Sequence, residues 1–178
     1  TEEFDAMALS TEPGARGLVL VPYLDGERTP DLPNATGILA GLRSDVEPGQ
    51  IARAAVEGVI CGLLEGGDYL ASLGLERGGR LIVTGGASRS RAYRQILADL
   101  TGQPVWTCDL PEAAAAGAAV QAAAAVQGRQ AADVARQWEP RYAVVAEPHA
   151  PETARSQDVR AAYRAALPLA GGGRETPQ

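Results

Sequence analysis

The feature that most constrains the fold of this sequence is its regular exchange between short apolar runs and longer segments with helical periodicity. The apolar runs, which suit buried strands, are residues 18–21, 36–42, 80–84 and 105–107. The segments that we expect to be helical are residues 1–14, 48–73, 90–101, 112–127, 130–137 and 152–167. Residues 141–145 are only weakly defined. Strands that alternate with helices in this way predict a layered α/β domain.

The longest predicted helix carries a stripe of small residues. Ala54, Gly58, Gly62 and Gly66 recur at every fourth position, which places them on one helix face. Each glycine inside a helix costs about 0.5–1 kcal/mol relative to alanine, so the stripe needs a compensating reason. We interpret it as close packing against another backbone. A similar alanine stripe makes the predicted helix at 112–127 the expected partner.

The most informative local motif is a predicted strand that ends in two glycines and leads directly into a helix. Gly85 and Gly86 leave no Cβ atom between the backbone and an approaching anion. The helix that follows offers unpaired N–H groups and the positive end of its dipole, and Ser88 or Ser90 can cap it. The motif is compatible with phosphate binding, but a plain tight turn explains the same residues without a ligand. It lacks the GxGxxG spacing of a dinucleotide site.

A second polar segment, at residues 25–30, follows a buried strand. Two carboxylates and an arginine lie within its six residues, DGERTP. Ligand contacts in α/β proteins often lie at such strand ends, but a solvated turn with a local ion pair explains the segment equally well. The remaining candidates have plainer interpretations as helix caps, packing residues or an exposed loop residue: Asp109, Glu112, Trp106, Trp138 and His149.

Composition excludes several kinds of site. All sixteen basic side chains are arginine, so this chain alone offers no P-loop lysine and no amine for a Schiff base. The single histidine excludes a histidine-rich metal site. A net charge of −6 argues against nucleic acid as the main partner. No apolar run reaches the roughly 18 residues of a membrane span. We interpret Cys61 and Cys108 as reduced thiols of a cytoplasmic protein.

Four segments, taken in order, resemble one protein family. They read PYLDGERTP at residues 22–30, GILAGL…QIARAAVE at 37–57, LIVTGGASRS…YRQILADL at 81–100, and PEAAAAGAA at 111–119. This series resembles the FGGY family of carbohydrate kinases, and its first segment is similar to the corresponding loop of the xylulokinases in that family.

The resemblance implies an actin/hexokinase-like fold with two domains of ribonuclease-H-like topology and ATP in the cleft between them. Residues 1–167 would then form the α/β nucleotide-binding domain of the C-terminal half, incomplete on its N-terminal side, with a flexible tail at 168–178. The resemblance places the following residues at the nucleotide: Gly85 and Gly86 near the phosphates, Ala87 lining the same pocket, and Ser90 near the adenosine.

The activity that the resemblance implies is transfer of a phosphoryl group from ATP, with Mg²⁺, to a sugar hydroxyl, D-xylulose being favoured. The family's catalytic aspartate and most sugar contacts belong to a segment upstream of Thr1. We therefore expect no catalytic residue, no metal ligand and no independent activity in this chain.

The expected partners are ATP or ADP and a small sugar, with a homodimer as a further option and no nucleic acid or membrane. Three alternatives stay open. The chain could belong to a kinase for gluconate, ribulose or glycerol. It could be a catalytically silent nucleotide-binding or interaction module of the same fold, or a fragment that does not fold alone.

Overall fold

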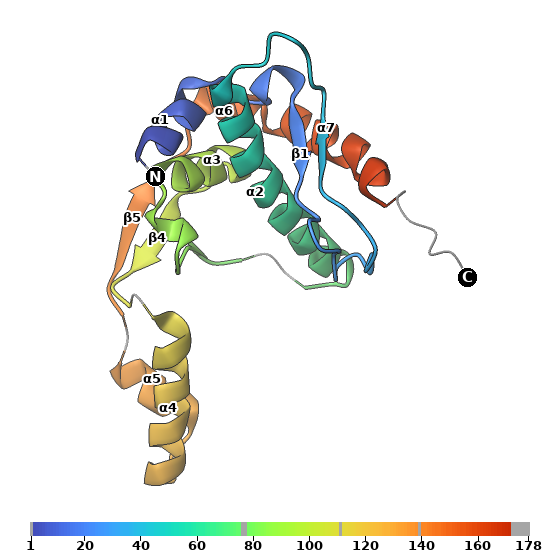
Figure 1. Ribbon diagram of the computed structural model, residues 1–178. Helices are drawn as coiled ribbons and strands as arrows, with labels where there is room; N and C mark the ends of the chain where they lie inside the picture. The colour runs from blue at the N-terminus through green and yellow to red at the C-terminus, as the bar shows by residue number, and fades with distance from the viewer. Residues whose placement is uncertain (1, 76–77, 111, 139, 172–178) are drawn as a thin grey trace, which may run out of the picture.

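The computed structural model describes residues 2–75, 78–110, 112–138 and 140–171 (Figure 1). Its helices are α1 (Glu2–Ser10), α2 (Pro48–Ser72), α3 (Arg91–Thr101), α4 (Ala113–Gln127), α5 (Ala131–Gln137), α6 (Ala150–Ala154) and α7 (Ser156–Ala170). Two single 3₁₀ turns are η1 (Ala15–Gly17) and η2 (Ala87–Arg89). Its strands are β1 (Val19–Val21), β2 (Ile38–Ala40), β3 (Leu81–Ile82), β4 (Val105–Cys108) and β5 (Tyr142–Ala146). The α/β class predicted from the sequence is confirmed.

The strands form two small sheets. β1 pairs with β2 in antiparallel register, while β3 runs parallel to β4, which in turn pairs antiparallel with β5. Helix α3 forms the crossover connection that the parallel strands β3 and β4 require. The weakly defined residues 141–145 prove to be most of β5, so pairing with β4 supplies the order that their sequence pattern does not.

Helix α2 is the centre of the packed body, where it contacts α1, α3, α7 and β1. Its first turn is fixed by a capping box, in which the Gln50 side chain accepts the Glu47 backbone N–H at 2.6 Å. One turn further on, buried Arg53 and Glu57 form an ion pair with 2.6 Å between Nε and Oε1. Both carboxylate oxygens of Glu57 also accept the N–H of Gly14, at 3.0 and 3.2 Å, which ties the loop after α1 to this helix.

The small-residue stripe of α2 packs closely, but not against the expected helix. A Cβ atom added at Gly58 would lie 2.2 Å from the carbonyl oxygen of Leu20 in β1, and one at Gly62 would lie 3.1 Å from the hydroxyl of Tyr163 in α7. At Gly66 an added Cβ would meet no heavy atom within 4 Å. Close packing against another backbone is therefore confirmed at Gly58, whose partner is β1, whereas Gly62 packs against a side chain of α7.

The predicted contact between α2 and the alanine-rich helix α4 is wrong. Helix α4 packs on α5, and Figure 1 shows this pair projecting away from the body of the molecule. The alanines of the stripe on α4 are exposed: Ala114, Ala118 and Ala122. An alanine stripe permits close approach of another helix but does not select which surface approaches it.

The C-terminal segment differs from the prediction in two ways. The single helix expected at 152–167 is two helices, α6 and α7, and α7 continues through Pro168 to Ala170. Ala170 is fully buried, and its carbonyl oxygen accepts the N–H of Thr36 at 3.3 Å. The expected tail at 168–178 therefore does not begin at residue 168. The buried face of α7 continues to Ala170 and holds the helix against the core beyond that point. Residues 172–178 lie outside the described residues.

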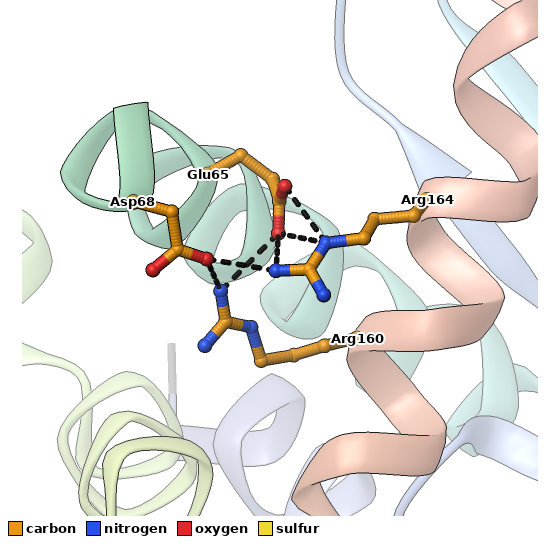
Figure 2. Close-up of polar contacts among 4 residues, drawn as sticks. All are labelled: Glu65, Asp68, Arg160 and Arg164. Atoms are coloured by element: carbon orange, nitrogen blue, oxygen red, sulfur yellow. Dashed lines mark hydrogen bonds and ion pairs between the residues drawn. The ribbon is translucent and has the colours of Figure 1, made fainter. Parts of the chain in front are cut away.

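A four-residue charge network joins the second half of α2 to α7 (Figure 2). The Nε of Arg164 lies 2.8 Å from one carboxylate oxygen of Glu65, and its Nη2 lies 2.7 Å from Asp68. Arg160 contacts the same two carboxylates. Each acidic side chain is thus shared by both arginines, which fixes the C-terminal helix along α2.

Candidate functional site

The glycine-rich turn follows β3 where the sequence predicts it. The strand itself is shorter than the predicted 80–84, although Val83 extends the pairing by donating its N–H to the carbonyl oxygen of Trp106 at 2.8 Å. The chain then turns at Gly85, whose φ of +79° lies in the left-handed region that favours glycine. The 3₁₀ turn η2 follows, and the helix begins at Arg91.

The turn presents bare backbone to solvent. Gly85, Gly86 and Ala87 are all exposed, and a Cβ atom added at either glycine would meet no heavy atom within 4 Å. The hydroxyl of Ser88 donates to the carbonyl oxygen of Gly85 at 2.7 Å, a hydrogen bond that joins the two ends of the turn. An anionic group can therefore approach the glycine backbone closely, as the sequence motif requires.

The N-terminus of α3, in contrast, is already occupied by the protein itself. The hydroxyl of Ser90 accepts the N–H of Tyr93 at 3.0 Å and donates to Oδ1 of Asp5 at 2.6 Å. The other oxygen of Asp5 accepts the N–H of Arg91 at 2.7 Å. This buried carboxylate satisfies the helix end and lies at the positive end of its dipole.

This contact corrects the expectation that the helix N-terminus is open to a phosphate. Ser90 is a helix cap, as one interpretation of the sequence proposed, and its contact with adenosine stays a prediction. Asp5 is the residue that sequence reasoning missed. It lies 85 positions before Ser90, and its only local signal is the acidic first turn of α1. The nucleotide contacts expected at Gly85, Gly86 and Ala87 also stay predictions.

The loop at residues 25–30 is organised by its own polar groups. The carboxylate of Glu27 accepts the N–H groups of Arg28 and Thr29, at 2.7 and 3.2 Å. The backbone of Glu27 exchanges two 2.9 Å hydrogen bonds with that of Leu32 across the turn. Glu27 thus shapes the loop rather than forming an ion pair with Arg28. The structure places the loop beside the second half of α2, apart from the glycine turn (Figure 1).

The remaining candidates have structural roles. Asp109 accepts the N–H of Arg141 at 2.9 Å and so connects the ends of β4 and β5. The side chain of His149 is exposed as predicted, while its backbone N–H donates to buried Asp99 at 2.7 Å. The guanidinium carbon of Arg80 lies over the ring of Trp106, 4.9 Å from the centroid of that ring.

Two further predictions differ from the structure. Trp138 is 48% exposed at the end of α5, so its interpretation as a packing residue is wrong. Glu112 precedes α4 but makes no side-chain cap hydrogen bond.

Burial decides the state of the thiol at Cys61. The side chain is buried beside Glu57, and burial raises the pKa of this thiol to about 12, so it is protonated at neutral pH. Among the described residues, no group of three or more His, Cys, Asp or Glu side chains could hold a metal ion. Within the same part of the chain, no helix is long and apolar enough to cross a membrane.

Comparison with known proteins assigns this chain to a family. Residues 1–126, more than half of its length, match the family model described as "FGGY family of carbohydrate kinases, C-terminal domain". The chain belongs to the FGGY family of carbohydrate kinases. The motif-based resemblance is therefore confirmed, and the glycine turn lies inside the matched region.

Relatives within the FGGY family agree on the fold and differ in substrate. The xylulose kinase of Streptomyces coelicolor is 41% identical over 129 residues, which cover 72% of this chain and 27% of that protein. The gluconate kinase of Lactobacillus acidophilus has a similar structure, with a TM-score of 0.81 and 26% identity over 96% of this chain and 35% of the other.

The glycerol kinase of Plasmodium falciparum, solved with ADP, is similar in fold alone. It has a TM-score of 0.72 and 22% identity, over 95% of this chain and 33% of that protein. The neighbours support the actin/hexokinase-like fold predicted for this FGGY chain. The chain spans about a quarter of the length of the Streptomyces relative that it matches.

Proposed function

We propose that this chain is the nucleotide-binding portion of an FGGY sugar kinase that transfers a phosphoryl group from ATP to a sugar hydroxyl. The observation that carries the proposal is the exposed turn at Gly85 and Gly86, where bare backbone follows strand β3. Membership of the FGGY family supports phosphoryl transfer as the reaction class. Xylulose kinases among the relatives favour D-xylulose as the acceptor, with xylulose 5-phosphate as the product.

The residues of the turn fit a nucleotide phosphate. A side chain at either glycine would fill the space that a phosphate oxygen needs, and both positions are free of neighbouring atoms. Ala87 adds only a methyl group beside them, and the Ser88 hydroxyl is directed back to the carbonyl of Gly85. ATP, with Mg²⁺, supplies the phosphoryl group when bound. The role of this chain is to hold the phosphate end of the nucleotide in a fixed position.

The catalytic base is proposed to lie outside this chain. Two carboxylates that the sequence or the structure draws attention to have structural partners, because Asp5 caps α3 and Asp109 connects two strands. Phosphoryl transfer depends mainly on positioning and charge neutralisation, so the remaining portion of the kinase would bring the sugar and the base to this turn. The chain alone is then expected to be inactive. We also expect the kinase to be cytoplasmic.

A second acceptor sugar has specific support. The gluconate kinase of Lactobacillus acidophilus has a similar structure, with a TM-score of 0.81, which makes D-gluconate the alternative substrate. A phosphorylation assay of the chain joined to the upstream portion of its own kinase separates these sugars. We expect turnover with D-xylulose and much less with D-gluconate, D-ribulose or glycerol. Turnover with gluconate alone would replace the proposed substrate and retain the reaction class.

Nucleotide binding is tested by calorimetric titration of Mg·ADP and Mg·ATP into this chain, alone and joined to that upstream portion. We expect binding that appears, or tightens markedly, when the upstream portion is present. The variant Gly86→Arg places a long side chain where the phosphates lie and is expected to abolish binding. Gly117→Arg adds the same charge at an exposed glycine of α4 with equal free space, and it is the matched control. Equal affinity for both variants would contradict the proposal.

A further inference from the structure

A cavity of about 530 Å³ lies between the loop at residues 25–30, the second half of α2 and the end of α7. Pockets that bind small molecules have volumes of about 300 to 1,000 Å³ and mostly apolar walls with a few polar groups. The cavity is separate from the nucleotide turn, whose residues do not line it. It also gives a structural context to the loop at 25–30, which the proposed phosphoryl transfer does not use.

Gly66 forms part of the cavity wall, and none of the described residues packs closely against it. The glycines one and two turns earlier in α2 are required by close contacts with β1 and α7. An added Cβ at Gly66 would instead meet no heavy atom within 4 Å, although a glycine inside a helix is unfavourable. The absence of a side chain at this position therefore keeps space open in the cavity.

The opposite wall is held in one conformation by the loop's own contacts. Glu27 binds two backbone N–H groups of its loop, and its backbone pairs with that of Leu32. At Gly26, with a φ of +86°, an added Cβ would lie 2.5 Å from the carbonyl oxygen of Pro33, so the two arms of the loop are in close contact. A wall built in this way can orient a ligand without first being ordered by it.

The lining defines the chemistry of the ligand. Tyr69, Pro30 and Leu167 supply an apolar surface, while Arg28 and Asp31 supply one positive and one negative group. Glu65 also lines the cavity, but its carboxylate is already shared by the two arginines of α7 (Figure 2). A charged ligand therefore finds no excess of opposite charge. A neutral molecule with an apolar face and several hydroxyl groups matches all of these groups.

We propose that this cavity binds a monosaccharide in its ring form, as a second ligand site distinct from the nucleotide turn. The apolar face of the sugar ring lies on Tyr69 and Pro30, and its hydroxyls exchange hydrogen bonds with Arg28 and Asp31. The site does not depend on the kinase reaction, because none of its lining residues belongs to the nucleotide turn.

The test is an NMR titration of the isotope-labelled chain with D-glucose and D-xylose, with D-gluconate as an anionic open-chain comparison. We expect saturable shifts for residues of the cavity, with at least tenfold weaker effects from D-gluconate. Gly66→Leu fills the cavity from a position with free space, and Tyr69→Ala removes half-exposed apolar surface. Each is expected to weaken ring-sugar binding at least tenfold. Gly117→Leu, at an open glycine outside the cavity, is the matched control and leaves binding unchanged.

Three results would overturn the proposal. The first is the absence of saturable shifts at the cavity with either ring sugar. The second is equal affinity for Gly66→Leu and Gly117→Leu, which would show that the sugar binds elsewhere. The third is D-gluconate binding as tightly as the ring sugars, which would contradict a neutral site. The amide spectrum of each variant reports whether it is folded, so a loss of binding through unfolding is recognised directly.

Discussion

Helices α2 and α4 are both rich in small residues, but the molecule uses them differently. Most residues in the first half of α2 are buried, and Gly58 and Gly62 of this helix contact β1 and α7. Helix α4 carries no charged residue, yet Ala124 is the only buried position that its described residues contain. Small side chains allow close approach in both helices. The difference lies in whether a complementary surface is within reach.

The contrast continues inside α2 itself. Its first half contains the buried pair Arg53–Glu57, whereas its second half carries Glu65 in a partly exposed network and Gly66 at the wall of a cavity. One continuous helix therefore serves as a core element at one end and as part of a candidate ligand site at the other. Substitutions at matched positions can separate these two roles.

Among the substitutions that remove a contact, the largest effect is expected from Glu57→Ala, which removes one member of the buried pair. Arg53 would remain buried without its carboxylate, and the N–H of Gly14 would lose its acceptor. We expect the free energy of unfolding to fall by about 3–5 kcal/mol, measured by urea denaturation. Arg43→Ala, which breaks an exposed pair with Asp45, is the control and should change it by less than about 0.5 kcal/mol. A similar loss for both variants would contradict the distinction between core and surface.

Gly58→Ala comes next, because the new methyl group would lie 2.2 Å from the carbonyl oxygen of Leu20. Overpacking of this kind is expected to lower stability by about 1–3 kcal/mol in spite of the better helix propensity of alanine. Gly66→Ala is the matched control, where the methyl group meets open space and stability should rise by about 0.5–1 kcal/mol. Thermal unfolding of the two variants measures both signs. Stabilisation by both variants would show that helix propensity alone decides these positions.

A smaller effect is expected from Ser90→Ala, which removes the cap of α3. The Tyr93 N–H loses its acceptor and Asp5 loses one of its two donors, although the Arg91 N–H remains. The expected decrease in stability is about 1 kcal/mol. Ser88→Ala, whose hydroxyl bonds only within the turn, should cost less. Chemical denaturation of both variants distinguishes a structural cap from a residue that serves a ligand alone.

The smallest effect is expected in the projecting helix. Ala118→Glu introduces a charge at an exposed position of α4 and should change the free energy of unfolding by no more than about 0.5 kcal/mol. The same change at Ala54, which is 1% exposed in α2, should prevent stable folding because the charge would be buried without a partner. Circular dichroism and urea denaturation check both. A large loss of stability at Ala118 would mean that α4 has a packing partner in solution.

The candidate site was predictable where its chemistry is local. A strand, two glycines and a serine cap follow one another in the chain, so residues 81–101 could be assigned from sequence patterns alone. The expectation of a free helix N-terminus failed because Asp5 approaches Ser90 from 85 positions earlier. No periodicity reports such a contact. The cavity beside Gly66 could not be predicted either, since three separate segments line it.

The sequence by itself determined the α/β class, most helix positions, the glycine turn and the family, because each of these depends on neighbouring residues or on a recognisable order of motifs. Only the tertiary structure decided the partners. It placed β1 and α7 against the glycines of α2, left the alanine stripe of α4 exposed, and brought Asp5 to the cap of α3. The physical reason is that a small or capping residue limits only how closely another segment can approach. Which segment approaches depends on the path of the whole chain.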